Sequence, residues 1–270
     1  IAAVVLTAAG LLWQFKEDMA PVLCVLFLAV SSALIGFLDD YEKLTKKRNL
    51  GLTVIQKLVL QIAVTVIFLV LLEVLHISSG VVRVPFFNTE FTLPKIVYYI
   101  AATFIIMGTV NAANLTDGID GLATGVTIPI ACFFTAAAFM AGSQSVSVLS
   151  AAFAGGLLGF LIYNYNPAKV FMGDTGSLFI GGMVSGLAFV LDIPLIIIVV
   201  GLVYFIEALS DILQVGYFKL THGKRIFKMA PIHHHFELCG WSEKKIFYVF
   251  SGVTLVLAAL SVYGVRCLFL

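Results

Sequence analysis

The sequence predicts an all-α integral membrane protein that crosses the bilayer about nine times and forms a single domain over residues 1–270. Hydrophobic residues make up 61% of the chain, charged residues only 11%, and the mean hydropathy is +1.07. A soluble domain has about 45–50% apolar and about 25% charged residues. The excess of apolar residues is what repeated bilayer-spanning helices of about 20 residues require.

The apolar segments follow one another along the whole chain. They lie at residues 1–12, 20–38, 53–75, 95–113, 121–141, 147–163, 175–191, 193–218 and 246–265. The first is too short to cross a bilayer, and the chain starts at Ile1 within it rather than at a Met. We therefore expect an N-terminally truncated part of a longer protein.

One polar segment alternates in a way that favours strands. Residues 81–93 alternate apolar and polar side chains around Asn88 and Thr89, which predicts a small β-hairpin. An irregular loop is the alternative. Helix alternation places this segment on the outer side of the membrane.

The charge distribution agrees with this threading. If successive spans cross the bilayer in opposite directions, the basic segment 43–48 and the basic residues between 219 and 245 lie on the same side. Only Lys16, Arg83, Lys95 and Arg266 remain on the other side. The positive-inside rule makes the richer side cytoplasmic. All four polar clusters of the chain emerge on that side, which is typical of a membrane enzyme or transporter with a one-sided site.

The first cluster is the pair Asp39 and Asp40, which ends a span and precedes Lys43. Adjacent carboxylates repel each other unless a cation neutralises them. Lys43 or Mg²⁺ could supply that charge. The pair is interpreted as a base, a metal ligand or both, and a solvated helix end is the alternative.

The second and third clusters combine acids, amides and glycines. Asp117 and Asp120 are three residues apart and would share a face if they lay on a helical turn, although Asp120 could be a plain N-cap. Asp174 lies between two glycines, and a helix opening near Ser177 would offer free N–H groups to an anion. Phe171 is interpreted as a loop anchor or a stacking surface.

The fourth cluster, His233 to His235, lies among lysines. Three consecutive histidines point in different directions on a helix, which disfavours a shared metal site and favours phosphate contacts. Glu207 and Asp211 lie within the segment 193–218, and counting back from Lys219 places them ~18 Å and ~12 Å deep in a straight span. Intramembrane acids indicate either function or a buried polar pair. Gln214 is nearer the cytoplasmic end and could join the site.

Four motifs, in their order along the chain, resemble those of a known enzyme family. Residues 36–43, 114–121 and 171–177 resemble the polyprenyl-phosphate N-acetylhexosamine-1-phosphate transferase superfamily. Residues 229–241 are similar to a narrower branch, the phospho-N-acetylmuramoyl-pentapeptide transferases of bacterial peptidoglycan synthesis, which serves cell shape and division. The resemblance implies ten transmembrane helices in the full protein, of which the first and part of the second are missing here. It also implies a location in the bacterial inner membrane with a cytoplasmic active site.

The resemblance implies a reaction in which UDP-MurNAc-pentapeptide and undecaprenyl phosphate give lipid I and UMP, with Mg²⁺ as cofactor. It implies catalytic roles for Asp39, Asp40, Asp174 and His233, with Asp174 as metal ligand and Asp39 as base. Substrate contacts are expected from Lys43, Asn114, Asp117, Asp120, Asn164, Phe171, Gln214, His233, His234 and His235. Direct attack and an aspartyl-phosphate intermediate are both open.

Two other functions compete with this interpretation. A sister transferase would move GlcNAc-1-phosphate to a polyprenyl phosphate, but its pattern interrupts the run of histidines. An ion-coupled transporter would use Glu207 and Asp211, although such proteins tend to place their sites near the midplane between repeats. The expected partners are the two substrates and the bilayer, with no nucleic acid. The resemblance also suggests a homodimer.

Overall fold

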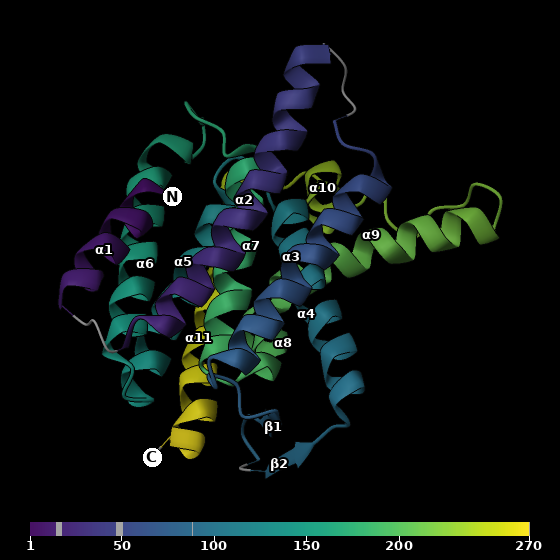
Figure 1. Ribbon diagram of the computed structural model, residues 1–270. Helices are drawn as coiled ribbons and strands as arrows, with labels where there is room; N and C mark the ends of the chain where they lie inside the picture. The colour runs from purple at the N-terminus through teal and green to yellow at the C-terminus, as the bar shows by residue number, and fades with distance from the viewer. Residues whose placement is uncertain (15–17, 47–50, 88, 270) are drawn as a thin grey trace.

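The computed structural model describes residues 1–14, 18–46, 51–87 and 89–269. Helices dominate it (Figure 1). In chain order the helices are α1 (Ala2–Gln14), α2 (Ala20–Lys46), α3 (Val54–Val74), α4 (Lys95–Thr116), α5 (Leu122–Met140), α6 (Gln144–Asn164), α7 (Gly173–Val190), the 3₁₀ turn η2 (Pro194–Ile196), α8 (Ile197–Val200), α9 (Leu202–Leu220), α10 (Ile232–Leu238) and α11 (Glu243–Phe269). The strands are β1 (Val81–Val84) and β2 (Thr89–Thr92).

The predicted fold class is confirmed. Within the described residues, seven helices are long and apolar enough to cross a membrane, namely α2 to α7 and α11. An eighth span would join η2 and α8 to α9, and α1 is a shorter apolar helix. Together these elements account for the nine apolar segments that the sequence predicts, and the chain is a multi-pass membrane protein.

The segment 193–218 is not the straight span that we predicted. It bends by 80° between residues 194–200 and α9, with Gly201 at the break. The first turn of α9 is anchored by the buried Tyr204, whose hydroxyl shares a hydrogen bond with Thr127 of α5. The rest of α9 runs sideways out of the bundle (Figure 1). The depths predicted for Glu207 and Asp211 are therefore wrong, because they assumed a straight helix across the bilayer.

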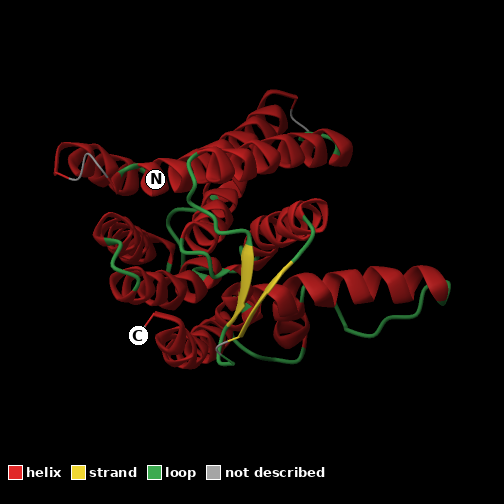
Figure 2. Cartoon of the chain, turned by 60° about the horizontal axis from the view of Figure 1, so that its bottom comes forward, coloured by secondary structure: helices red, strands yellow, loops and turns green. Residues whose placement is uncertain are grey.

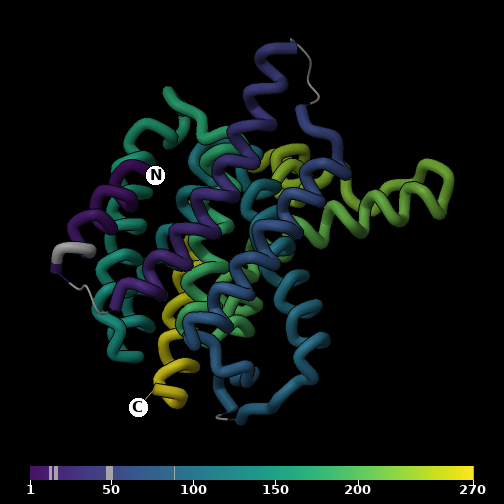
Figure 3. The backbone as a smooth tube through the Cα atoms, in the orientation of Figure 1, coloured from purple at the N-terminus to yellow at the C-terminus, as the bar shows by residue number. Residues whose placement is uncertain are grey.

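Two helices form the centre of the bundle. Of the residues in the most apolar stretch of each span, 72% are buried in α5 and 78% in α7. These shares are larger than in the other five spans. α7 packs against α2 and α4, and α5 packs against α6 and α11. The tube in Figure 3 shows α7 behind α2, although more than a hundred residues separate them in the chain. This packing brings the end of α2 next to the beginning of α7.

The predicted hairpin is confirmed. β1 and β2 pair antiparallel, with Val81 opposite Thr92 and Val84 opposite Thr89 (Figure 2). Asn88, which the prediction placed at the turn, lies outside the described residues. The hairpin lies at the end of the bundle opposite to α10 and the tip of α2 (Figure 1).

Helix α3 begins with a capping box. The Thr53 hydroxyl accepts a hydrogen bond from the backbone N–H of Gln56, and the Gln56 side chain accepts one from the N–H of Thr53. This arrangement satisfies backbone donors that a helix start leaves unpaired. It also fixes where α3 begins, shortly after Leu52.

We predict that Thr53→Ala lowers the free energy of unfolding by about 1 kcal/mol because the cap is lost. Unfolding in detergent, followed by circular dichroism, measures the change. Thr45→Ala is the matched control, since the exposed Thr45 hydroxyl donates to carbonyls of its own helix and caps no helix start. The control is expected to stay within about 0.5 kcal/mol of the parent protein. Equal losses in the two variants would contradict the capping role.

Candidate functional site

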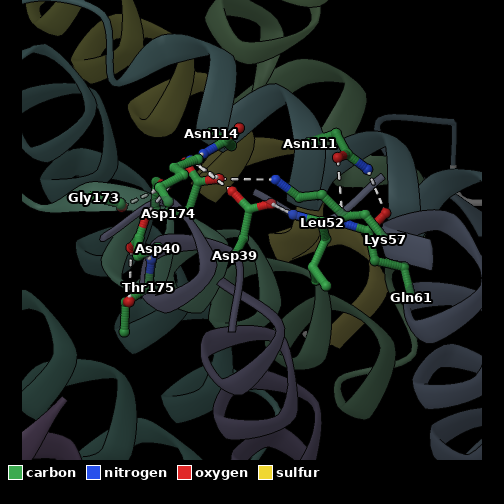
Figure 4. Close-up of polar contacts among 12 residues, drawn as sticks. Asp39, Asp40, Leu52, Lys57, Gln61, Asn111, Asn114, Gly173, Asp174 and Thr175 are labelled. Carbon is green, nitrogen blue, oxygen red and sulfur yellow. Dashed lines mark hydrogen bonds and ion pairs between the residues drawn. The ribbon is translucent and has the colours of Figure 1, made fainter. Parts of the chain in front are cut away.

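The centre of the candidate site is a cluster of three carboxylates, which we call the acid cluster. Asp39 and Asp40 lie in the C-terminal part of α2, and Asp174 lies in the first turn of α7. Oxygen atoms from all three lie within 4.8 Å of one another. The close packing of α2 on α7 therefore brings two of the sequence clusters into a single site (Figure 4).

The protein holds one oxygen of each α2 carboxylate. Asp39 Oδ1 accepts the backbone N–H of Leu52 at 2.8 Å. Asp40 Oδ2 accepts both the N–H and the hydroxyl of Thr175, at 3.0 and 2.9 Å. These bonds tie the end of α2 to the start of α3 and to the start of α7 (Figure 4).

Asp174 is held in the same way. Its Oδ1 accepts the side-chain N–H of Asn114 at 2.9 Å, and Asn114 also donates to the Ser177 hydroxyl at 2.8 Å. Asn114 comes from the end of α4, so the predicted second cluster reaches the acid cluster through its first residue. The structure thus places Asn114, which we expected to contact substrate, beside Asp174.

The remaining oxygens of the three carboxylates face one cation. Lys43 Nζ lies 2.6 Å from Asp39 Oδ2, 3.6 Å from Asp40 Oδ1 and 3.2 Å from Asp174 Oδ2. Lys57 Nζ lies 3.0 Å from the same Asp174 oxygen. Each carboxylate therefore has one oxygen held by a backbone, hydroxyl or amide donor and a second, here called its free oxygen, that faces the Lys43 ammonium. The sequence does not predict the role of Lys57, because nothing in the spacing of the residues connects Lys57 with Asp174.

This donor set fits a divalent cation. Three carboxylates repel one another, and the two ammonium groups leave the cluster with a net charge of about −1. Carboxylate oxygens are the ligands that Mg²⁺ prefers, and it is commonly held by one or two of them together with substrate phosphates. Asp39, Asp40 and Asp174 could hold such an ion at the centre that their free oxygens share.

The start of α7 differs from our expectation in one respect. The helix begins at Gly173, so Asp174 lies in its first turn rather than in a loop before Ser177. The N–H groups of a helix start can bind an anion, and here Asp40 accepts the N–H of Thr175. The anion at this helix start is therefore a carboxylate of the protein itself.

Asp117 and Asp120 do not share a helical face. They lie in the turn between α4 and α5, where Asp120 accepts hydrogen bonds from the Asn166 side chain and from the N–H of Ala168. The N-cap of α5 is Gly121, so the alternative of Asp120 as a cap is wrong. Burial, together with the negative charge of Asp174, raises the pKa of Asp117 to about 7.

Two predicted binding residues use their polar atoms within the protein. Asn164 is buried, donates to the carbonyl of Val170 and accepts from the Thr124 hydroxyl. The side-chain oxygen of Gln214 accepts the N–H groups of Ile226 and Phe227. Both residues therefore shape the loops beside the site. Their direct contact with substrate stays a prediction.

Phe171, unlike Asn164 and Gln214, is exposed. Its side chain is 74% exposed in the connection between α6 and α7, three residues before Asp174. An exposed ring three residues from Asp174 is free to stack on a base, whereas the anchor alternative would require it to be buried. The exposure favours the stacking interpretation.

The three histidines have three different environments on α10. His233 is fully buried, and its Nδ1 lies 2.9 Å from Glu207 Oε2. His234 pairs with Glu237 at 2.5 Å and is half-buried. His235 Nδ1 accepts the N–H of Lys228 at 3.1 Å. The divergent directions that we predicted are confirmed, and of the three only His233 is linked to Glu207.

Two neighbouring cavities lie on this side of the bundle. One, of about 480 Å³, is lined by residues that include Asp39, Lys57 and Asp174 of the site. The other, of about 670 Å³, is apolar and lies between α3, α4 and α9. Leu58 and Asn111 line both of them. A ligand with an apolar tail and an anionic head could occupy both cavities at once.

Comparison with known proteins identifies the family. Residues 22–192 match glycosyl transferase family 4. The chain is 47% identical over 245 residues to the phospho-N-acetylmuramoyl-pentapeptide-transferase of Staphylococcus carnosus, covering 90% of this chain and 75% of the relative. It is 50% identical over 231 residues to the enzyme of that name from Clostridium acetobutylicum, covering 86% and 72%. The chain belongs to the phospho-N-acetylmuramoyl-pentapeptide-transferase family.

Family membership confirms the resemblance drawn from the four motifs. The chain is a membrane-bound phosphotransferase of peptidoglycan synthesis. The sister transferase is not favoured, because relatives with the phospho-N-acetylmuramoyl-pentapeptide name match most of the chain at about half identity. The matched region of glycosyl transferase family 4 contains the acid cluster and the turn with Asp117 and Asp120.

We predict that Gly173→Ala disrupts the acid cluster. Gly173 has φ +65°, and a Cβ there would lie 2.9 Å from Asp40 Oδ2. Left-handed strain costs about 1–2 kcal/mol, and displacement of Asp40 is expected to lower transferase activity about 10-fold or more. Turnover and thermal unfolding in detergent measure the two effects.

Gly142→Ala is the matched control for this variant. Gly142 has φ +77°, but a Cβ there would meet nothing within 4 Å among the described residues, its two chain neighbours aside. The variant should lose stability through strain and keep its turnover per folded molecule. Equal activity losses in the two variants would show that strain alone, and not the collision with Asp40, explains the effect.

The raised pKa of Asp117 predicts a pH dependence of stability. Because the folded-state pKa of about 7 exceeds the ordinary value of 3.8, the folded protein binds the proton more tightly than the unfolded chain does. The contribution to stability is fully present below about pH 4 and is lost as pH rises through 7. Asp117→Asn should therefore stabilise the protein more at pH 8 than at pH 5, in EDTA. Thermal unfolding measures this, and an equal difference at both pH values would contradict it.

Proposed function

We propose that the protein transfers phospho-MurNAc-pentapeptide from UDP-MurNAc-pentapeptide to undecaprenyl phosphate, giving lipid I and UMP, with Mg²⁺ as cofactor. The observation that carries this proposal is the acid cluster, whose free oxygens share one centre and which lines a cavity that shares Leu58 and Asn111 with a neighbouring apolar cavity. The names of the relatives supply the identity of the substrates. Such a site suits one soluble and one membrane-embedded substrate.

The apolar cavity is the proposed site of the lipid chain. Its lining includes Ile62, Val66, Ile100 and Phe104, and α9 forms one of its walls. A polyprenyl chain that lies there would bring its phosphate towards Leu58 and Asn111, and hence towards Lys57. Asn111 is held in place by a reciprocal amide pair with Gln61 (Figure 4).

The bonds that change are those of a phosphate transfer. An oxygen of the lipid phosphate forms a bond to the phosphorus next to the sugar, and the bond from that phosphorus to UMP breaks. Catalysis of this step consists mainly of positioning and charge neutralisation. Lys43 and Lys57 supply positive charge beside Asp174, which suits the approach of two anionic phosphates.

The proposed Mg²⁺ ligands are the free oxygens of the acid cluster, with Asp174 as the principal one. Mg²⁺, when bound, neutralises negative charge on the diphosphate and on the transferred group. Asp39 is the proposed base, although the lipid phosphate is already largely ionised at neutral pH and needs little help. Asp40 and Asn114 hold Thr175 and Asp174, and so keep the cluster in shape.

The nucleotide and sugar are proposed to lie on the side of the α4–α5 turn and α10. Asp117, Asp120, Phe171 and the histidines His233 and His234 surround that side. Asp117 is protonated near neutral pH more readily than an ordinary aspartate because its pKa is raised, so it can donate a hydrogen bond to a hydroxyl or carbonyl oxygen. This property suits contact with a neutral part of the substrate.

The site is proposed to face the cytoplasm at the bacterial inner membrane. The excess of lysine and arginine on this side supports the assignment. UDP-linked substrates occur in the cytoplasm, which is consistent with it. Homodimer formation remains an expectation from the family resemblance.

The test is a transferase assay with the purified full-length protein in detergent, undecaprenyl phosphate, labelled UDP-MurNAc-pentapeptide and Mg²⁺. Lipid I should form only with a divalent cation, and Asp174→Asn should lower turnover by about 100-fold or more. Glu42→Gln is the matched control, because Glu42 also pairs with a lysine on α2 but lies outside the cluster. No lipid I from a folded protein would overturn the proposal, and transfer from UDP-GlcNAc would redirect it to the sister reaction.

A further inference from the structure

Glu207 and His233 form a fully buried pair between α9 and α10. Both side chains have 0% exposure, and Glu207 Oε2 lies 2.9 Å from His233 Nδ1 and 3.5 Å from the His233 backbone N. The acid therefore contacts both the ring and the first turn of the short helix that carries it. None of the roles proposed above uses Glu207.

The pair is incompletely satisfied. Within the described residues, Glu207 Oε1 and His233 Nε2 are buried and have no hydrogen-bond partner. A buried polar atom without a partner costs about 1–3 kcal/mol, and an apolar pair of similar volume is often at least as stable as a buried ion pair. Stability alone therefore does not account for these two side chains.

The unpartnered ring nitrogen has a definite direction. A Cβ placed on Gly118 would lie 2.1 Å from His233 Nε2, so the ring packs directly on the backbone of the α4–α5 turn. Gly118 follows Asp117, whose pKa is raised in part by the charge of Asp174. His233 Nε2 thus points at the α4–α5 turn. Through this turn, α10 is linked to the acid cluster.

The other two histidines lack this arrangement. His234 pairs with Glu237 of its own helix, and both side chains are half-buried. His235 is bonded to the backbone of Lys228. In the part of the chain that the structure describes, His233 alone of the three histidines receives a carboxylate from a different helix, and this carboxylate is shielded from water.

We propose that Glu207 is a positioning residue that acts on the reaction through His233. An ionised carboxylate can only accept a hydrogen bond, so it keeps a proton on Nδ1 and fixes the ring with Nε2 towards Gly118. There Nε2 packs against the α4–α5 turn and so holds Asp117 and Asp120 in place for the nucleotide substrate. The inference rests on the proposed function. It adds a role for an acid on α9, the helix that follows the 80° bend.

The test compares Glu207→Gln with the parent protein in the lipid I assay. Glutamine has nearly the same shape, but its amide can donate to Nδ1, which reverses the tautomer and removes the charge. We expect kcat to fall by about 10- to 100-fold, with both KM values changing by less than about 3-fold. The thermal unfolding temperature in detergent should stay close to that of the parent. A residue with a merely structural role would show the reverse pattern.

A double variant makes the test specific to His233. If Glu207 acts through the ring, Glu207→Gln in a His233→Ala background should cause no further loss of kcat. Glu73→Gln is the matched control, because Glu73 is also an acid in a spanning helix but pairs with Lys95 at the other end of the bundle. The control should keep the parent kcat.

Several outcomes would overturn the inference. They are parent-like kcat in Glu207→Gln, an additive loss in the double variant, or full activity of His233→Ala. If Glu207→Gln does not fold, Glu207→Asp, which keeps the charge but shortens the reach to Nδ1, takes its place and should also lose kcat. Lipid I formation by the parent protein separates the two proposals: its absence contradicts the proposed function, whereas its presence with an active Glu207→Gln contradicts only the role of Glu207.

Discussion

The structure depends on the charge balance among three carboxylates and two lysines. Asp39, Asp40 and Asp174 could not lie so close together without Lys43 and Lys57 between or beside them. Because these residues come from α2, α3 and α7, the balance also joins three parts of the chain that are far apart in sequence. The bonds to Leu52 and Thr175 fix the carboxylates on the side away from the lysines. The cluster is therefore rigid on one side and open to exchange of cations on the other.

The rest of the fold serves this arrangement. α7 is the most buried of the seven spans, and its start is accordingly held in place by its neighbours α2 and α4. The bend before α9 takes that helix out of the bundle and leaves an apolar cavity beside α3 and α4. The same bend places Glu207 where it can reach α10. One backbone break thus shapes both the apolar side of the site and the support of His233.

The sequence alone predicts the architecture well. Apolar segments and lysine placement depend on local composition, so the spans, the hairpin and the shared face of the four clusters follow from them. The contacts between side chains do not follow from local composition. Nothing in the spacing shows that Lys57 reaches Asp174, that Asp120 bonds to the 166–168 loop, or that Asn164 turns inward. The 80° bend was missed because the residues directly on both sides of Gly201, 197–200 and 202–206, are all apolar, and hydropathy does not report the direction of a helix.

The central claim is that the free oxygens of the acid cluster form a divalent cation site. Anomalous X-ray diffraction from crystals of the full-length protein soaked in Mn²⁺, a substitute for Mg²⁺ with similar ligand preferences, tests it most directly. The account predicts a peak between Asp39 Oδ2, Asp40 Oδ1 and Asp174 Oδ2, with the Lys43 ammonium displaced from that centre. A bound ion elsewhere, with Lys43 still in contact with all three carboxylates, would contradict it.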